Sequence, residues 1–365
     1  MSFISRTLAV VGISSLLGCA STDTLPEEEP TIVFGDGSHS LESISMTVVA
    51  QSNDDLNHPR DLAFHPDRTN ELWLVNRGDE SLTVLFDPGT DDFRSENFAS
   101  MGNNHFLAQP SSIAFSDNGN FATTHETDDF TQGPPPMGSP EDFMGPTLWS
   151  SDPDVVDGGH GGHLDMLHNS PNGMGVAWEE DNTFWVFDGY HNSISRYGFH
   201  GDHGPGGSDH SDGEVRRYVE GEVEREADVP SHMELDQQTG LLYIADTGNR
   251  RIAVLDTATG TLGANITPNY DGGDQRQVDG AEIATFVDRE IADMGEPSGL
   301  ALYNETLYVS DNRLGIIWAF NLEGELLDWV DLEREEDALM GITFDSEGRL
   351  YVVDSVAEEV LRIDL

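Results

Sequence analysis

Histidine is the residue type in this chain whose distribution most clearly indicates chemistry. Eight of the 13 histidines lie between positions 160 and 232, a window that holds only a fifth of the sequence. Imidazole nitrogens bind Zn²⁺, Cu²⁺ and Fe²⁺ well, and a nearby aspartate can complete or orient such a ligand set. The local excess therefore predicts a transition-metal site, with zinc or copper as the metal.

Two glycine-rich segments, residues 157–163 and 200–210, carry the first group of candidate ligands. This group consists of His160, His163, His200, His203 and His210. Glycine lets such loops fold tightly around an ion, and their aspartates offer oxygen ligands that would suit Ca²⁺ instead. Spacing alone leaves transition-metal, calcium and solvated-surface interpretations open, because the chain has no compact motif such as His-Glu-x-x-His.

A second group of candidate ligands lies outside these two segments. It consists of His125, His168, His191 and His232. Beside it we place Tyr190 as a candidate catalytic acid or base and Arg250 as a candidate for orienting an anionic group. The arginine has a simpler alternative role, which is pairing with one of the many neighbouring acids.

The elements that must position these residues are repeated along the chain. Six copies share one pattern: a turn that usually contains proline, a short apolar strand, a polar turn, a second apolar strand and then a third. The second strands are residues 72–76, 121–124, 184–188, 241–246, 307–311 and 350–354. A lone unit of this kind cannot bury both of its faces, so the repetition predicts an all-β, six-bladed β-propeller rather than a sandwich or a β-helix.

The last copy ends at Leu365, directly after its third strand. Residues 41–50 alternate in polarity ahead of the first copy, so we predict that this N-terminal strand closes the last blade and covers its edge. Propeller strands run alternately between two faces. We therefore expect the first histidine group at one face and the second group, with Tyr190 and Arg250, at the other face beside the axis.

Two segments resemble known families. Residues 242–252 closely resemble the NHL repeat, which implies a propeller blade for each copy. Residues 188–193 are similar to the segment that carries the catalytic tyrosine of the peptidylglycine amidating lyases, which would fall on Tyr190. The positions of that family's zinc histidines hold other residues here, namely Arg60, Ser111, Asn172, Ser231 and Ser298. Calcium-dependent lactonases and streptogramin lyases share the six-bladed architecture.

Two functions remain open at this point. One is a metal-dependent lyase or hydrolase, and the other is a non-catalytic scaffold that binds a small molecule or a protein, because a fold does not imply an activity. We expect a monomer in either case.

The N-terminus resembles a bacterial lipoprotein signal. Arg6 precedes an apolar stretch over residues 8–17, and the Leu-Leu-Gly-Cys sequence that ends at Cys19 resembles a lipobox. The resemblance implies a signal peptide over residues 1–18, a lipidated tether over 19–40 and the propeller over 41–365. Acylated Cys19 would anchor the protein in the outer membrane, since position 20 is not aspartate. Cys19 is the only cysteine, so the propeller has neither a disulfide nor a thiol nucleophile.

The chain is strongly acidic, with 68 acidic and 17 basic residues and a net charge of −51. Every basic residue is arginine, which excludes a lysine Schiff base and a P-loop lysine. Nucleic-acid phosphates would be repelled, so we expect no nucleic-acid partner. The acids are spread along the chain, which is typical of a surface adapted to a salty medium.

Overall fold

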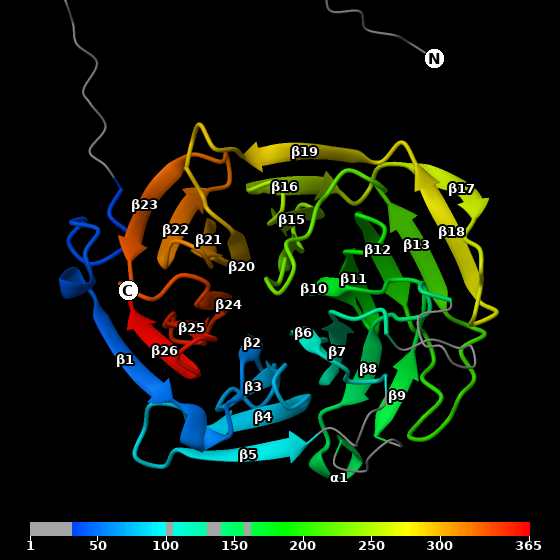
Figure 1. Ribbon diagram of the computed structural model, residues 1–365, viewed down its shortest axis with the longest axis horizontal. Helices are drawn as coiled ribbons and strands as arrows, with labels where there is room; N and C mark the ends of the chain where they lie inside the picture. The colour runs from blue at the N-terminus through cyan, green and yellow to red at the C-terminus, as the bar shows by residue number, and fades with distance from the viewer. Residues whose placement is uncertain (1–30, 100–104, 130–139, 157–161) are drawn as a thin grey trace, which may run out of the picture. The chain divides into compact units, whose positions relative to one another are not determined.

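Six mainly antiparallel β-sheets are arranged as blades around a central axis in this computed structural model (Figure 1). The structure describes residues 31–99, 105–129, 140–156 and 162–365. The prediction of an all-β, six-bladed β-propeller is confirmed. Within these described ranges, no helix is both long and apolar enough to cross a membrane.

Three blades follow the simplest pattern, in which four consecutive strands run in chain order from the axis outward. Blade 1 contains β2 (Pro59–Phe64), β3 (Glu71–Asn76), β4 (Ser81–Phe86) and β5 (Arg94–Ala99). Blade 2 contains β6 (Pro110–Phe115), β7 (Asn120–His125), β8 (Thr147–Ser150) and β9 (His163–Met166). Blade 5 contains β20 (Pro297–Tyr303), β21 (Thr306–Asp311), β22 (Ile316–Asn321) and β23 (Leu326–Asp331). Short helices η1 (Leu41–Ser43), η2 (Ser52–Asp54) and α1 (Pro153–Val156) lie in the connections.

The last blade is closed by an N-terminal strand, as predicted. Blade 6 contains β24 (Leu339–Phe344), β25 (Leu350–Asp354) and β26 (Glu359–Asp364), and β1 (Ser45–Ala50) joins its outer edge (Figure 1). β1 runs antiparallel to β26 and pairs Ser45 with Asp364 and Val48 with Leu361. Both ends of the folded chain therefore belong to one sheet, and the pairing of β1 with β26 closes the ring.

Blades 3 and 4 share strands, a feature that the sequence did not predict. Blade 3 contains β10 (Gly173–Glu180), β11 (Thr183–Asp188), β12 (Ser193–Gly198) and β13 (Glu214–Tyr218). Blade 4 contains β14 (Met233–Asp236), β15 (Leu241–Asp246), β16 (Arg251–Asp256) and β19 (Glu282–Val287). Between β16 and β19 the chain inserts a hairpin of β17 (Thr261–Asn265) and β18 (Asp274–Asp279). β18 pairs in parallel with β13, so blade 3 becomes a six-stranded sheet.

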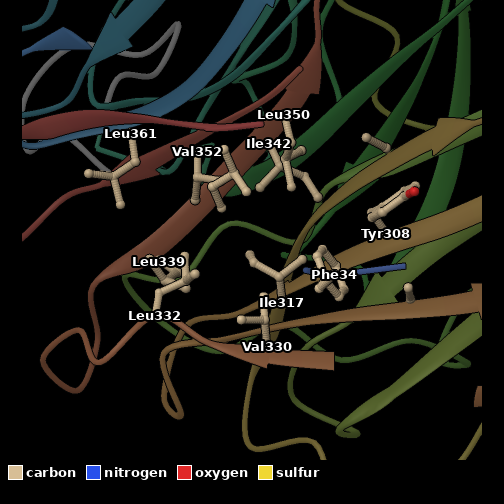
Figure 2. Close-up of a cluster of buried hydrophobic side chains, with 13 residues drawn as sticks. Phe34, Tyr308, Ile317, Val330, Leu332, Leu339, Ile342, Leu350, Val352 and Leu361 are labelled. Atoms are coloured by element: carbon tan, nitrogen blue, oxygen red, sulfur yellow. The ribbon is translucent and has the colours of Figure 1, made fainter. Parts of the chain in front are cut away.

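The apolar side chains pack between adjacent blades. Figure 2 shows one such cluster between blades 5 and 6, where Phe34 lies beside Ile317. Phe34 has no exposed surface, and the Oδ2 atom of Asp328 accepts hydrogen bonds of 2.8 Å from the N–H groups of Val33 and Phe34. Burial of a phenylalanine side chain stabilises a fold by about 1.5–3 kcal/mol. The chain thus packs on the ring from residue 33 onward, within the segment that the sequence analysis assigned to the tether.

Serine residues at the start of the inner strands tie neighbouring blades together. Ser111 Oγ donates to the carbonyl oxygen of Gly173 at 2.6 Å, and Ser298 Oγ donates to that of Pro230 at 2.8 Å. Both side chains are buried and bonded to the backbone of a neighbouring blade.

Candidate metal site

A buried carboxylate and two histidines come together where blade 2 meets blade 3. Asp165 lies in β9, and both His203 and His210 lie in the loop between β12 and β13. Each residue offers one ligand atom, and these three atoms all lie within 4.8 Å of one another. The side chain of Asp165 has no exposed surface, and that of His203 is 3% exposed. The group could hold a metal ion.

The hydrogen bonds of this group leave two buried atoms without partners. His210 Nδ1 lies 2.6 Å from Asp165 Oδ1, and this hydrogen bond raises the pKa of His210 although burial opposes the rise. His203 Nδ1 lies 2.6 Å from the carbonyl oxygen of Gly204, so Nδ1 carries the proton and Nε2 presents a lone pair. Among the described residues, neither His203 Nε2 nor Asp165 Oδ2 has a hydrogen-bond partner. A buried polar atom of this kind costs roughly 1–3 kcal/mol, and a bound cation would satisfy both atoms.

Glycine allows the loop of residues 199–213 to fold over β9. Gly204 and Gly206 have positive φ angles of 71° and 75°. A Cβ atom at Gly207 would lie 2.6 Å from the carbonyl oxygen of His203, which is too close for any side chain. The N–H group of His203 donates to the carbonyl oxygen of Leu164 at 3.2 Å and so docks the loop on β9.

A cavity of about 490 Å³ opens beside this group, and His210 forms part of its wall. Aromatic rings form much of the remaining wall. Phe106 stacks on His163 with ring centroids 3.7 Å apart, and Phe143 lies against His168 at 4.1 Å. The cavity could therefore hold a small molecule with one edge next to the candidate ligands.

A histidine–aspartate pair borders the same cavity. Asp271, in the turn between β17 and β18, accepts hydrogen bonds from both the backbone N–H and the Nδ1–H of His168. The Asp271 side chain is almost completely buried. His168 Nε2 is also buried and has no partner within the described part of the chain. The rings of His168 and His210 are 5.9 Å apart, so this pair lies next to the candidate metal ligands.

The structure brings together histidines that the sequence analysis placed at opposite faces. His163, His203 and His210 come from the first predicted group and His168 comes from the second, yet all four lie around this cavity or its metal group. The physical reason is that β9 has only four residues, so both of its ends reach the same region. The site also lies at the outer strands of the blades rather than beside the central axis.

The other predicted ligands of the second group lie in separate surroundings. His125 Nδ1 lies 3.0 Å from the carbonyl oxygen of Gly145, and burial lowers the pKa of His125 to about 4. His191 Nδ1 lies 2.8 Å from Asp188 Oδ2. His232 Nε2 faces a carboxylate of blade 1 in the central channel. In the ranges that the structure describes, no second group of three metal-ligand atoms is found.

Three more residues of the sequence analysis remain, namely His200, His160 and Cys19. His200 is exposed at the start of the loop that carries His203 and His210. His160 lies outside the described residues, as does Cys19. Their predicted roles in metal binding and lipid attachment stay predictions.

The predicted catalytic pair is not part of this cavity wall. Tyr190 is 38% exposed and donates to Glu141 Oε2 at 3.1 Å, while burial of its hydroxyl raises the pKa of Tyr190. Arg250 follows β15 in blade 4 and has a positive φ of 53°. The catalytic roles of Tyr190 and Arg250 stay predictions that the geometry does not test.

Sequence reasoning did not select Asp165 or Asp271. Asp165 follows His163 by two residues, but the register between β8 and β9 shifts at this point, so strand alternation in the sequence does not place their side chains on one face. Asp271 reaches the site only because the inserted hairpin joins blade 3, and no local pattern indicates that pairing.

Comparisons with known proteins show the fold. No protein-family model matches this chain, and no curated protein matches it. A gluconolactonase from Xanthomonas campestris is 14% identical with a TM-score of 0.57, over 92% of this chain and 94% of that one. An auxiliary nutrient binding protein from Bacteroides thetaiotaomicron is 11% identical with a TM-score of 0.57, over 88% and 76%. Virginiamycin B lyase from Staphylococcus aureus is 12% identical with a TM-score of 0.52, over 88% and 99%. At these identities the likeness is one of fold alone.

Proposed function

We propose that this protein is a transition-metal-binding β-propeller and that its metal serves a hydrolase or lyase reaction in the adjoining cavity. The proposed ligands are Asp165, His203 and His210. The observation that carries the proposal is a pair of buried atoms, Asp165 Oδ2 and His203 Nε2, that have no hydrogen-bond partner among the residues the structure describes. They belong to a group whose ligand atoms lie within 4.8 Å of one another.

The donor set favours zinc. Two imidazole nitrogens and one carboxylate match the three protein ligands of catalytic zinc sites, which leave a fourth position open for water or substrate. Copper and iron(II) accept the same donors. Ca²⁺ takes six to eight oxygen ligands, and only Asp165 of the three residues supplies oxygen.

The residues around the cavity supply the remaining chemistry. A bound metal would polarise a substrate oxygen or lower the pKa of a coordinated water. Asp271 holds the Nδ1–H of His168, so Nε2 can accept a proton from a nucleophile or from a substrate carbon. The aromatic wall formed by Phe106 and Phe143 excludes water from the reacting groups.

The structural relatives support this class of function and also its alternative. The similar folds include a gluconolactonase and a virginiamycin lyase, whose names describe a hydrolase and a lyase. They also include a nutrient binding protein, which supports a non-catalytic role in ligand binding. One observation favours that alternative: the described part of the cavity wall contains neither Tyr190 nor an arginine that could hold an anionic substrate.

We further propose that the propeller is exported and is tethered to the outer membrane through acylated Cys19, facing the periplasm or the cell surface as a monomer. The lipobox-like sequence and the apolar stretch before it support this assignment. The strongly acidic composition suits an exposed location in a salty medium.

Metal titration tests the proposed function. Chelator-stripped wild-type protein should bind one equivalent of Zn²⁺ in calorimetry. Asp165→Asn and His203→Ala should each weaken Zn²⁺ binding by more than roughly 10-fold. Loss of a residue that only hydrogen-bonds to a metal ligand already weakens metal binding by about that factor. His200→Ala is the matched control, because His200 lies on the same loop outside the group. Equal weakening in all three variants, or none in His203→Ala, would overturn the assignment.

A further inference from the structure

The central channel contains a second group of ionisable side chains, separate from the metal site. Asp61 lies in β2 of blade 1, and His232 directly precedes β14 of blade 4, on the opposite side of the ring. His232 Nε2 lies 3.5 Å from Asp61 Oδ2 and 3.4 Å from the carbonyl oxygen of Ser111 in blade 2. The imidazole ring therefore reaches across the axis and narrows the channel at this level.

Small residues in the other blades make room for this contact. Each inner strand pairs with the second strand of its blade, and this pairing identifies equivalent positions in the six blades. The positions level with Asp61 and His232 hold Ser112, Gly175, Gly299 and Gly341. A Cβ atom at Gly341 would lie 2.3 Å from Asp61 Oδ1. At this level, then, the two bulky polar side chains come from opposite blades.

Glu234 differs from its counterparts at the next level of the channel. The same alignment places Ala63, Ala114, Ala177, Ala301 and Thr343 at this position in the other blades. Because five blades fold with a small residue here, the propeller does not need a carboxylate at this position. Among the described residues, the Glu234 carboxylate has no hydrogen bond or ion pair.

Four of these five small residues, all except Ala301, line a cavity of about 350 Å³ that opens at the end of the channel opposite Arg60. Asp61, His232 and Glu234 line part of it, and the remaining wall includes the aromatic residues Phe64, Phe115, Trp178 and Phe344. Arginine is absent from this described lining, and the sequence contains no lysine. Burial, together with the nearby Asp61, raises the pKa of Glu234 to about 8.

We propose that this cavity binds a small organic cation of the alkylammonium class. An ammonium group would donate hydrogen bonds to the carboxylates of Glu234 and Asp61, while its carbon atoms contact the aromatic rings. Without a ligand, a carboxylate in this half-buried position beside Asp61 is costly to ionise, and a cation offsets that cost. The net charge of −51 also draws cations toward the protein. The proposal does not depend on the metal site.

Calorimetric titration with butylammonium tests the proposal, and butan-1-ol serves as the matched neutral probe. An alkylammonium stays protonated until about pH 10, so the titration can be run near pH 9, where Glu234 is ionised. High salt suppresses nonspecific attraction to the acidic surface. Wild-type protein should bind butylammonium and not butan-1-ol, and Glu234→Gln should weaken binding roughly tenfold or more.

Two control variants test whether the loss of butylammonium binding is specific to the Glu234 carboxylate. Glu323→Gln removes an exposed carboxylate of blade 5 and should leave the affinity unchanged. His203→Ala should also leave it unchanged, since it alters only the metal group. If Glu234→Gln does not fold, Glu234→Ala installs the residue that blades 1, 2, 3 and 5 carry at this position. Equal binding of both probes, or wild-type affinity in the Glu234 variants, would overturn the proposal.

Discussion

His210 Nδ1 lies 2.6 Å from Asp165 Oδ1, and this contact joins a loop of blade 3 to the outer strand of blade 2. Neither blade holds the complete ligand group by itself. A metal bound by Asp165, His203 and His210 would therefore cross-link two blades that also meet through apolar packing and backbone hydrogen bonds. This arrangement links metal binding to the stability of the whole ring.

Saturating Zn²⁺ should raise the Tm of the wild-type protein, because a ligand that binds only the folded state stabilises it. At a free concentration of 100 times Kd the gain is about 2.7 kcal/mol. Differential scanning calorimetry with and without zinc measures the shift. His210→Ala should abolish it and His200→Ala should keep it. A full shift in His210→Ala would place the zinc elsewhere.

Glu234 should make the free energy of unfolding fall as pH rises from about 4.5 to about 8. The folded state binds the Glu234 proton more tightly than the unfolded state does, so the stabilising contribution is complete below the usual pKa of 4.5 and is lost as pH passes 8. Glu234→Gln should flatten the slope within this window, leaving the part due to Asp61, whose pKa is raised by burial as well. Urea unfolding at several pH values measures the slope, and Glu323→Gln should retain it.

Gly175→Ala should destabilise the fold by roughly 1–3 kcal/mol, because overpacking forces backbone shifts. The new Cβ atom would lie 2.1 Å from the carbonyl oxygen of Ser231 in the neighbouring blade. Gly201→Ala is the matched control, since its nearest contact there is 3.3 Å from an aspartate oxygen. Chemical denaturation compares the two variants, and equal stabilities would contradict the close approach of blades 3 and 4 at this point.

Deletion of residues 45–50 should lower the Tm markedly and promote association, because it removes β1 and exposes the outer edge of β26. Deletion of residues 20–30 should have little effect on the Tm, since the packing of the chain on blades 5 and 6 begins at Val33. Thermal unfolding and size-exclusion chromatography distinguish the variants. Similar behaviour of both deletions would argue against closure of the ring by β1.

Cys19→Ala should release the protein from the membrane fraction, because acylation supplies two or three chains to the anchor and stable attachment requires at least two such signals. Membrane fractionation of cells that express each form measures the change. The propeller itself should keep its Tm, since residue 19 lies ahead of the ring. Unchanged fractionation would contradict lipid anchoring at this residue.

The sequence predicted the blades well because their signals are local. The apolar run over residues 241–246 and its five counterparts each reappear as the second strand of a blade, and the alternating strand before blade 1 closes the ring. The metal group was predicted only in part. His203 and His210 were selected for their type and spacing, but Asp165 was missed, and its role depends on how the β12–β13 loop folds across β9. The contact of Asp271 with His168 depends on the parallel pairing of β18 with β13, and no local sequence pattern indicates a pairing between strands of two blades.

The hairpin of β17 and β18 belongs to blade 4 by chain connectivity and to blade 3 by hydrogen bonding. In a propeller, opening motions that expose amides to hydrogen exchange can be confined to one blade at a time, because each blade is a nearly independent sheet. Here the two blades cannot separate without breaking the ladder between β13 and β18. We therefore expect the amides of blades 3 and 4 to become protected or exposed as one cooperative unit, and Asp271 to leave His168 only when that unit opens.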